Sequence, residues 1–139
     1  MRRIISVAGI WIFVISMMTG VGSASAGYGA LAVGVDEATL KYGLSSNEET
    51  QKKAEEAALK ECGSDKCKIV FKTAGKKCGA IATPENSEKS ENSENTKKST
   101  VWGAADRPQR AAAELAAITN CQKHTKGQCK VRSVECNNK

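Results

Sequence analysis

The stretch that decides the fold is Tyr28-Gly29-Ala30-Leu31-Ala32-Val33, because it recurs as Cys78-Gly79-Ala80-Ile81-Ala82-Thr83. The glycine and both alanines recur in place, and the leucine of the first copy corresponds to an isoleucine in the second. Further along, Tyr42-Gly43 corresponds to Trp102-Gly103. Several matches in the same order along one chain indicate an internal repeat.

The repeat divides the chain into a first half, residues 27–77, and a second half, residues 78–139. In each half an alanine-rich segment ends at one cysteine, a second cysteine opens a strand-like segment, and a third follows that segment. These cysteines are Cys62, Cys67 and Cys78 in one set and Cys121, Cys129 and Cys136 in the other. Residues 84–100 break the pattern, because they repeat Ser-Glu-Asn units with no apolar residue after Pro84. We expect them to form a disordered surface insert.

Two capping boxes predict where helices begin. The first box is Ser46 with Glu49, and the second is Asp106 with Gln109. In each box the first side chain can cap the start of the helix, and the side chain three residues later can bond back to the backbone N–H of the cap residue. The two predicted helices run to Cys62 and Cys121. Their apolar stripes are mostly alanine: Ala54, Ala57 and Ala58 in the first helix, and Ala111, Ala112, Leu115, Ala116 and Ile118 in the second. Side chains this small bury little apolar area, so disulfides must add stability.

Four segments predict β-strands: Tyr28–Val33, Lys68–Thr73, Cys78–Thr83 and Lys130–Val134. Partial alternation is visible in the second of these, where Ile69 and Phe71 share one face. Strands that accompany two helices predict an α+β domain. We expect two similar halves that contribute to one mainly antiparallel sheet with two packed helices.

The N-terminal residues predict export. Arg2 and Arg3 precede an apolar stretch from Ile4 to Met18, and Ala24-Ser25-Ala26 follows, which together form a cleavable signal peptide over residues 1–26. The alternative, an uncleaved membrane anchor, is disfavoured because polar residues and glycines interrupt the apolar stretch. Cleavage lowers the formal net charge from +6 to +4, since it removes two arginines and no acid. We expect a periplasmic or extracellular protein with no transmembrane anchor after cleavage.

The six cysteines all follow the signal, and an even number in an exported chain predicts three disulfides. Zinc is the alternative, but the C-x4-C and C-x7-C spacings depart from C-x2-C knuckles, and His124 is the only histidine. We therefore expect neither a metal nor a cofactor. The repeat predicts Cys62–Cys67 and Cys121–Cys129 as local bonds, which leaves Cys78–Cys136 to close the second half.

These motifs resemble those of a bacterial family known as domain of unknown function 4189. The resemblance rests on four motifs, which are Tyr28–Val33, Lys60-Glu61-Cys62-Gly63, Cys67-Lys68-Ile69-Val70 and Cys78–Ala82. It covers nearly all of residues 27–139 and implies a small exported protein whose unit is often duplicated. It implies no catalytic residues. The chain departs from the family pattern in its charged insert, Glu85–Thr100.

The residues predict no catalytic site. His124 lies in a short basic segment between two cysteines, where a surface histidine is the simpler interpretation. Acids in the first predicted helix are interspersed with lysines, which is typical of a solvated helix face. A C-x-x-C motif for thiol exchange is absent from the sequence. We therefore expect a protein that is not an enzyme.

Basic residues are the remaining candidate for a functional surface. One basic face would form if two predicted strands were neighbours. It would contain Lys68 and Lys72 of the first half with Lys130 and Arg132 of the second. Such a face suits another protein or an anionic envelope surface, whereas nucleic acid is disfavoured because stacking aromatics are scarce. The simpler alternative is that these charges only keep the protein soluble.

We expect a protein-interaction, inhibitor or immunity-type module of the bacterial envelope. Two alternatives belong to other classes of protein. One is a secreted effector or enzyme with an unrecognised site, and the other is a structural component of the envelope.

Overall fold

The structure is a computed structural model that describes residues 27–85 and 99–138. The expected signal, residues 1–26, lies outside the described residues, as does most of the expected insert, residues 86–98. Neither of the helices in the described part is long and apolar enough to cross a membrane.

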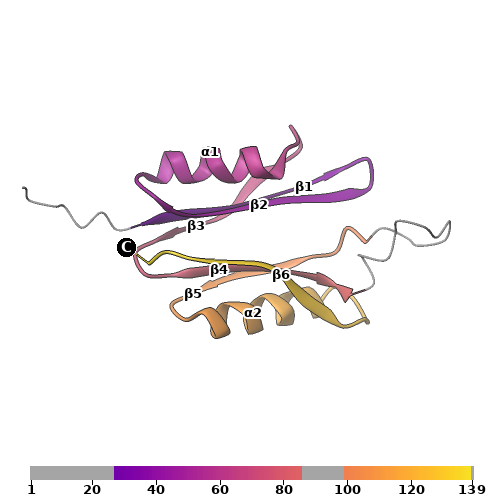
Figure 1. Cartoon of the computed structure of the whole chain (residues 1–139). Coiled ribbons are helices and arrows are strands. Elements are labelled where there is room, and N and C mark those ends of the chain that lie inside the picture. Colours follow the sequence, from indigo (N-terminus) through magenta and orange to yellow (C-terminus); the bar gives the residue numbers. More distant parts are fainter. Residues whose placement is uncertain (1–26, 86–98, 139) are drawn as a thin grey trace, which may run out of the picture.

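Each half forms a three-stranded antiparallel sheet and one helix (Figure 1). The first half contains β1 (Tyr28–Asp36), β2 (Thr39–Glu48), α1 (Gln51–Cys62) and β3 (Lys68–Ala74), with the strand order β2-β1-β3. The second contains β4 (Cys78–Pro84), β5 (Gly103–Arg107), α2 (Arg110–Gln122) and β6 (Cys129–Cys136), with the order β5-β4-β6. The predicted α+β class and the two similar halves are confirmed.

The two sheets lie face to face, with α1 and α2 on the outer faces (Figure 1). The strands therefore form two separate sheets, and the expectation of one sheet is wrong. The reason is that the sheets contain two edge strands beyond the four predicted ones. β2 and β5 each take an edge beside the central strand of their own half, which completes a three-stranded sheet there. Pro84, expected to open the insert, is instead the last residue of β4.

The central strands β1 and β4 are buried on both faces. Large and small side chains alternate along them, so that one face carries the large side chains and the other carries alanines. Leu31 and Ile81 are fully buried between the sheets, where Phe71, Tyr42 and Trp102 pack around them. The opposite faces carry alanines that meet helix alanines: Ala30 and Ala32 with Ala54 and Ala58, and Ala80 and Ala82 with Ala113 and Ala117. The larger side chains thus fill the space between the sheets, and alanine lets each helix approach its sheet closely.

Both helices begin later than the capping boxes predict. α1 begins at Gln51, after the N-cap Thr50, whose side chain accepts a hydrogen bond from the Lys53 backbone N–H at 3.2 Å. α2 begins at Arg110, and its N-cap has no side-chain hydrogen bond. Ser46 and Asp106, the predicted caps, lie in β2 and β5, because strand pairing continues as far as Glu48 and Arg107. The hydrogen bonds between these edge strands and the central strands are therefore favoured over the local helix caps.

The buried face of α2 also differs from the predicted stripe. Ala113, Ala117 and Cys121 are buried, whereas Leu115 is 66% exposed. In α1 the equivalent buried residues are Ala54, Ala58 and Cys62. In both helices the buried face is the one that carries the terminal cysteine, at i, i+4 and i+8. In both helices the disulfide to the following strand therefore lies on the buried face.

Three disulfides join the described elements, and they are the three pairs expected from the sequence. Cys62–Cys67 and Cys121–Cys129 each tie the end of a helix to the region where the next strand begins. Cys78–Cys136 joins two residues that lie opposite each other in β4 and β6. No described cysteine is free.

Asn137, directly after β6, connects the second half to the first sheet. Its side chain is buried, accepts from the Asn47 backbone N–H at 2.9 Å, and donates to Thr73 Oγ1 at 3.0 Å. Gly29 leaves the space for it, since a Cβ there would lie 3.3 Å from Asn137 Oδ1 and 2.6 Å from Thr73 Oγ1. One amide therefore links both edge strands of the first sheet to the C-terminal end of the second half.

Asn137→Ala is expected to lower the free energy of unfolding by about 2 kcal/mol, because it leaves the Asn47 N–H and the buried Thr73 hydroxyl without this partner. Chemical denaturation measures the change. Asn138→Ala is the matched control, since Asn138 bonds to Asn47 Oδ1 through its backbone N–H, which alanine retains. Equal stability of the two variants would contradict the role of Asn137.

Candidate functional site

The structure does not bring the four predicted basic residues together. Their strands, β3 and β6, belong to different sheets, and β6 lies beside β2. Lys72 forms an ion pair with Glu55 of α1 at 2.8 Å. Arg132 donates to Thr83 Oγ1 and, at 3.0 Å, to the Pro84 carbonyl, so it helps to hold β6 against β4. The condition for one basic face, which was that the two strands are neighbours, is not met.

Lys68 is exposed on β3, and Lys130 is half-buried on β6. Both residues lie on edge strands, but each belongs to a different half. Neither contributes to the site described below.

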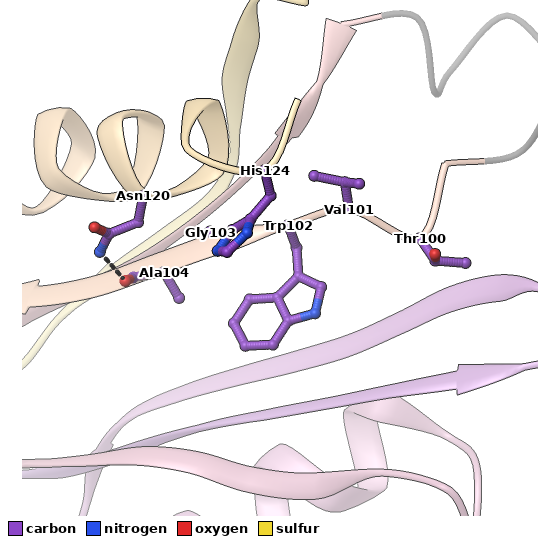
Figure 2. Close-up of a pocket in the computed structure, with 7 residues that line it drawn as sticks. All are labelled: Thr100, Val101, Trp102, Gly103, Ala104, Asn120 and His124. Carbon is purple, nitrogen blue, oxygen red and sulfur yellow. Dashed lines mark hydrogen bonds between the residues drawn. The ribbon is translucent and has the colours of Figure 1, made fainter. Parts of the chain in front are cut away.

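A hollow of about 430 Å³ lies in the second half, along β5 and the residues that precede it (Figure 2). Its lining residues are Thr100, Val101, Trp102, Gly103, Ala104, Asn120 and His124. β5 is an edge strand of its sheet, and the end of α2 supplies the opposite wall. Asn120 Nδ2 donates to the Ala104 carbonyl at 2.8 Å and so joins the two walls.

His124 reaches the hollow from the loop after α2, and Figure 2 shows its imidazole beside Gly103. The disulfide Cys121–Cys129 closes this loop, and the His124 backbone N–H donates to the Cys121 carbonyl at 3.0 Å. Lys123 Nζ donates to Asn120 Oδ1 at 3.3 Å. The loop is therefore attached at both ends and also to the residue that joins the two walls.

The basic side chains of this loop are exposed, and it contains no acid. We call it the basic loop, residues 121–129. Lys123, His124 and Lys126 are all exposed on it, and the sequence contains no acid between Glu114 and Glu135. Because it borders the hollow, the basic loop gives this end of the second half a positive potential that attracts anionic groups.

The equivalent loop of the first half has a different character. Its cysteines, Cys62 and Cys67, are 5 residues apart, whereas Cys121 and Cys129 are 8 apart. It holds Asp65 beside Lys66, and its Ser64 hydroxyl donates to Asp36 at 2.9 Å. The two halves share a fold, but the longer basic loop and its hollow belong to the second half.

The sequence alone does not predict this site. In sequence, His124 indicates only a surface histidine, and Trp102 only marks the repeat. The available signal was the difference between the two cysteine loops, since only the longer loop carries basic residues without an acid. The described residues contain no group of three or more His, Cys, Asp or Glu side chains that could hold a metal ion.

Comparison with known proteins places the chain in a family. No curated protein matches it. Among solved structures, it is similar to the NMR structure of Rv1813c from Mycobacterium tuberculosis, with 21% identity, coverage of 99% of this chain and 98% of that chain, and a TM-score of 0.46. The family model described as "Domain of unknown function (DUF4189)" matches residues 28–136, which confirms the family resemblance expected from the motifs. The chain therefore belongs to the DUF4189 family.

Proposed function

We propose that this protein is an exported, non-enzymatic module of the bacterial envelope that binds another protein through the basic loop of its second half. The observation that carries the proposal is the basic loop itself. It is exposed, closed by Cys121–Cys129, tied to Asn120, and adjacent to a hollow.

Export is supported by the disulfides, and the packing of Gly27 is compatible with it. Disulfides persist in oxidising compartments outside the cytoplasm. Gly27 is the residue after the expected cleavage site. Gly27 is buried, and its carbonyl accepts from the Gly75 backbone N–H at 3.1 Å. Removal of residues 1–26 would therefore leave the fold with its first residue already in place.

A protein partner suits this site because the loop backbone is held before binding. A loop fixed by a disulfide and hydrogen bonds loses less conformational entropy on association than a flexible one. The hollow beside it can accept a side chain of the partner, which is where interfaces concentrate their binding energy. A partner segment with Asp or Glu residues complements Lys123 and Lys126. This arrangement fits an inhibitor or immunity-type role, in which a rigid loop meets an acidic cleft.

Reversing the charge of the basic loop is expected to weaken partner binding more than tenfold, because like charges would then face each other across the interface. The variant is Lys123→Glu with Lys126→Glu in the oxidised, exported protein. Quantitative mass spectrometry after affinity purification from envelope and culture-medium fractions identifies the partner, and titration calorimetry with the purified partner measures the affinity.

The matched control is Lys60→Glu with Lys66→Glu, which makes the same change of charge at two exposed lysines near the equivalent loop of the first half. The control is expected to bind as the unmodified protein does. If both double variants retain the same proteins at the same affinity, the basic loop is not the binding site.

A further inference from the structure

The two helices occupy equivalent places in the fold, but their solvent faces differ. The face of α1 is charged, with Lys52 paired to Glu56 at 3.9 Å and Lys53 donating to Glu49. That hydrogen bond and the charge of Glu49 raise the pKa of Lys53 above its usual value. Such a face is solvated and needs no further cover.

The solvent face of α2 is largely uncharged. Ala111, Leu115, Thr119 and Gln122 are exposed at helical spacing, and we call them the α2 outer stripe. Leu115, 66% exposed, is the most exposed large hydrophobic side chain of the described residues. The Thr119 hydroxyl donates to the Leu115 carbonyl at 2.8 Å, so its hydrogen is used within the helix. The stripe thus presents one large apolar side chain among small and weakly polar ones.

We propose that the α2 outer stripe docks an amphipathic helix of the partner protein, which runs antiparallel to α2 and carries acidic residues in its first turn. The inference rests on the proposed function only in that the ligand is a protein. Small side chains at a helix contact let the two axes approach to about 8 Å. Ala111 and Thr119 lie one turn on either side of Leu115, so the leucine can insert between side chains of the partner helix.

Charge fixes the direction of the partner helix. At the N-terminal end of α2, Arg110 is neutralised by Glu114 at 3.0 Å. The C-terminal end is followed by the basic loop, where Lys123 and Lys126 have no acid near them in sequence. An antiparallel helix places its N-terminus at this end. Acidic residues are favourable in the first turn of a helix, and here they would also meet these lysines.

The same charges disfavour a second copy of this chain as the occupant. In an antiparallel pair, Arg107 of one copy would approach Lys123 and Lys126 of the other, and α2 has no acid in its first turn. A membrane surface is disfavoured for a different reason. The outer stripe has one large apolar side chain and no aromatic residue, whereas interfacial helices bury a broad apolar face.

Site-specific photo-crosslinking tests the inference in the producing bacterium. A benzophenone amino acid replaces Leu115 or, as the matched control, Leu59, which is 38% exposed on α1. We expect a discrete adduct from position 115 and none from position 59. The crosslinked partner peptide, located by tandem mass spectrometry, should belong to a helix with Asp or Glu in its first turn.

A synthetic peptide of that segment then serves as the probe in fluorescence anisotropy. Leu115→Glu is expected to weaken its binding at least about 30-fold, and Leu59→Glu by less than about twofold, because hot-spot losses concentrate in buried apolar anchors. Thermal unfolding of both variants checks that the fold is retained. Because the Leu115 side chain is largely exposed, the melting temperature of the Leu115→Glu variant should stay close to that of the unmodified protein.

Several outcomes would overturn the docking helix. An adduct with this same chain would identify a homodimer, and uptake of the unmodified protein by vesicles of phosphatidylglycerol and phosphatidylcholine would identify a membrane surface. Equal losses from Leu115→Glu and Leu59→Glu would remove the role of the stripe. If Leu115→Glu still binds a partner that the variant Lys123→Glu with Lys126→Glu no longer binds, the docking helix is wrong and the proposed function stands. If neither variant affects binding, both fail.

Discussion

Gly103→Ala is expected to destabilise the protein by about 3 kcal/mol or more, because α2 leaves no room for a side chain at this position. A Cβ on Gly103 would lie 2.0 Å from the backbone nitrogen of Cys121 and 2.6 Å from the Ala117 carbonyl oxygen. Both atoms belong to the helix backbone, which a rotamer change cannot move. The helix would have to lift from β5 and pull on Cys121–Cys129. Thermal and denaturant unfolding measure the loss.

Gly127→Ala is the matched control in the same half. The nearest atom to its added Cβ is Thr125 Oγ1 at 3.6 Å, which is an ordinary contact. We expect a change within about 0.5 kcal/mol. Gly43, the counterpart of Gly103, is equally confined, since its Cβ would lie 2.1 Å from the Ala58 carbonyl oxygen. An unfolding curve for Gly103→Ala that matches the unmodified protein would show that the helix does not rest on this strand as described.

Removal of the disulfide Cys78–Cys136 is expected to lower the melting temperature more than removal of Cys62–Cys67. The first bond spans 58 residues of sequence and the second spans 5. Loop-closure entropy assigns roughly 4 kcal/mol to the long loop and roughly 2 kcal/mol to the short one. The long-range bond also precedes Asn137, which connects β6 to the first sheet. Its loss should therefore weaken the contact between the halves as well as the second half itself.

The comparison uses Cys78→Ser with Cys136→Ser against Cys62→Ser with Cys67→Ser, so that neither variant keeps an unpaired thiol. Calorimetry gives both melting temperatures, and reduction of the unmodified protein gives the limit with every bond broken. The single substitutions Cys136→Ser and Cys67→Ser should follow the same order. Equal melting temperatures would refute the ranking by loop length.

The repeat and the cysteines made much of the fold predictable. The central strands β1 and β4 are the two copies of the quoted motif, extended by a few residues. The disulfide pairs followed from the position of each cysteine in its half. The repeat and the cysteine positions can both be read from the order of residues, so these predictions require no knowledge of packing. The alanines in both helices pack against the alanines of the central strands.

The helix starts and the edge strands could not be predicted in the same way. Ser46 and Asp106 have good capping sequences, but β2 and β5 run through them because they pair with β1 and β4. The backbone bonds of a strand to a distant partner outweigh a local cap. The buried face of α2 differs in part from the predicted stripe for a related reason. Ile118 of that stripe packs against the core, but Leu115 is exposed, because packing on β4 and β5 buries Ala113, Ala117 and Cys121.

The candidate site depended even more on tertiary structure. The four predicted basic residues do not share one sheet. Lys68 and Lys72 lie on β3, whereas Lys130 and Arg132 lie on β6 in the other sheet. The hollow combines residues before and within β5 with Asn120 and His124, and only the packing of α2 on β5 brings them together. Sequence order alone does not state which strand edge a loop will border.

The order of residues by itself determined that this protein consists of two alike units, each bonded internally through sulfur, with central strands made of alternating small and larger side chains. That alternation implies two buried surfaces on every central strand, because both kinds of side chain are apolar. Only the folded molecule decided what covers each surface: a helix over the alanines, and the other unit over Leu31 and Ile81. The choice depends on how much volume lies between layers, and volume is a property of elements brought together in space.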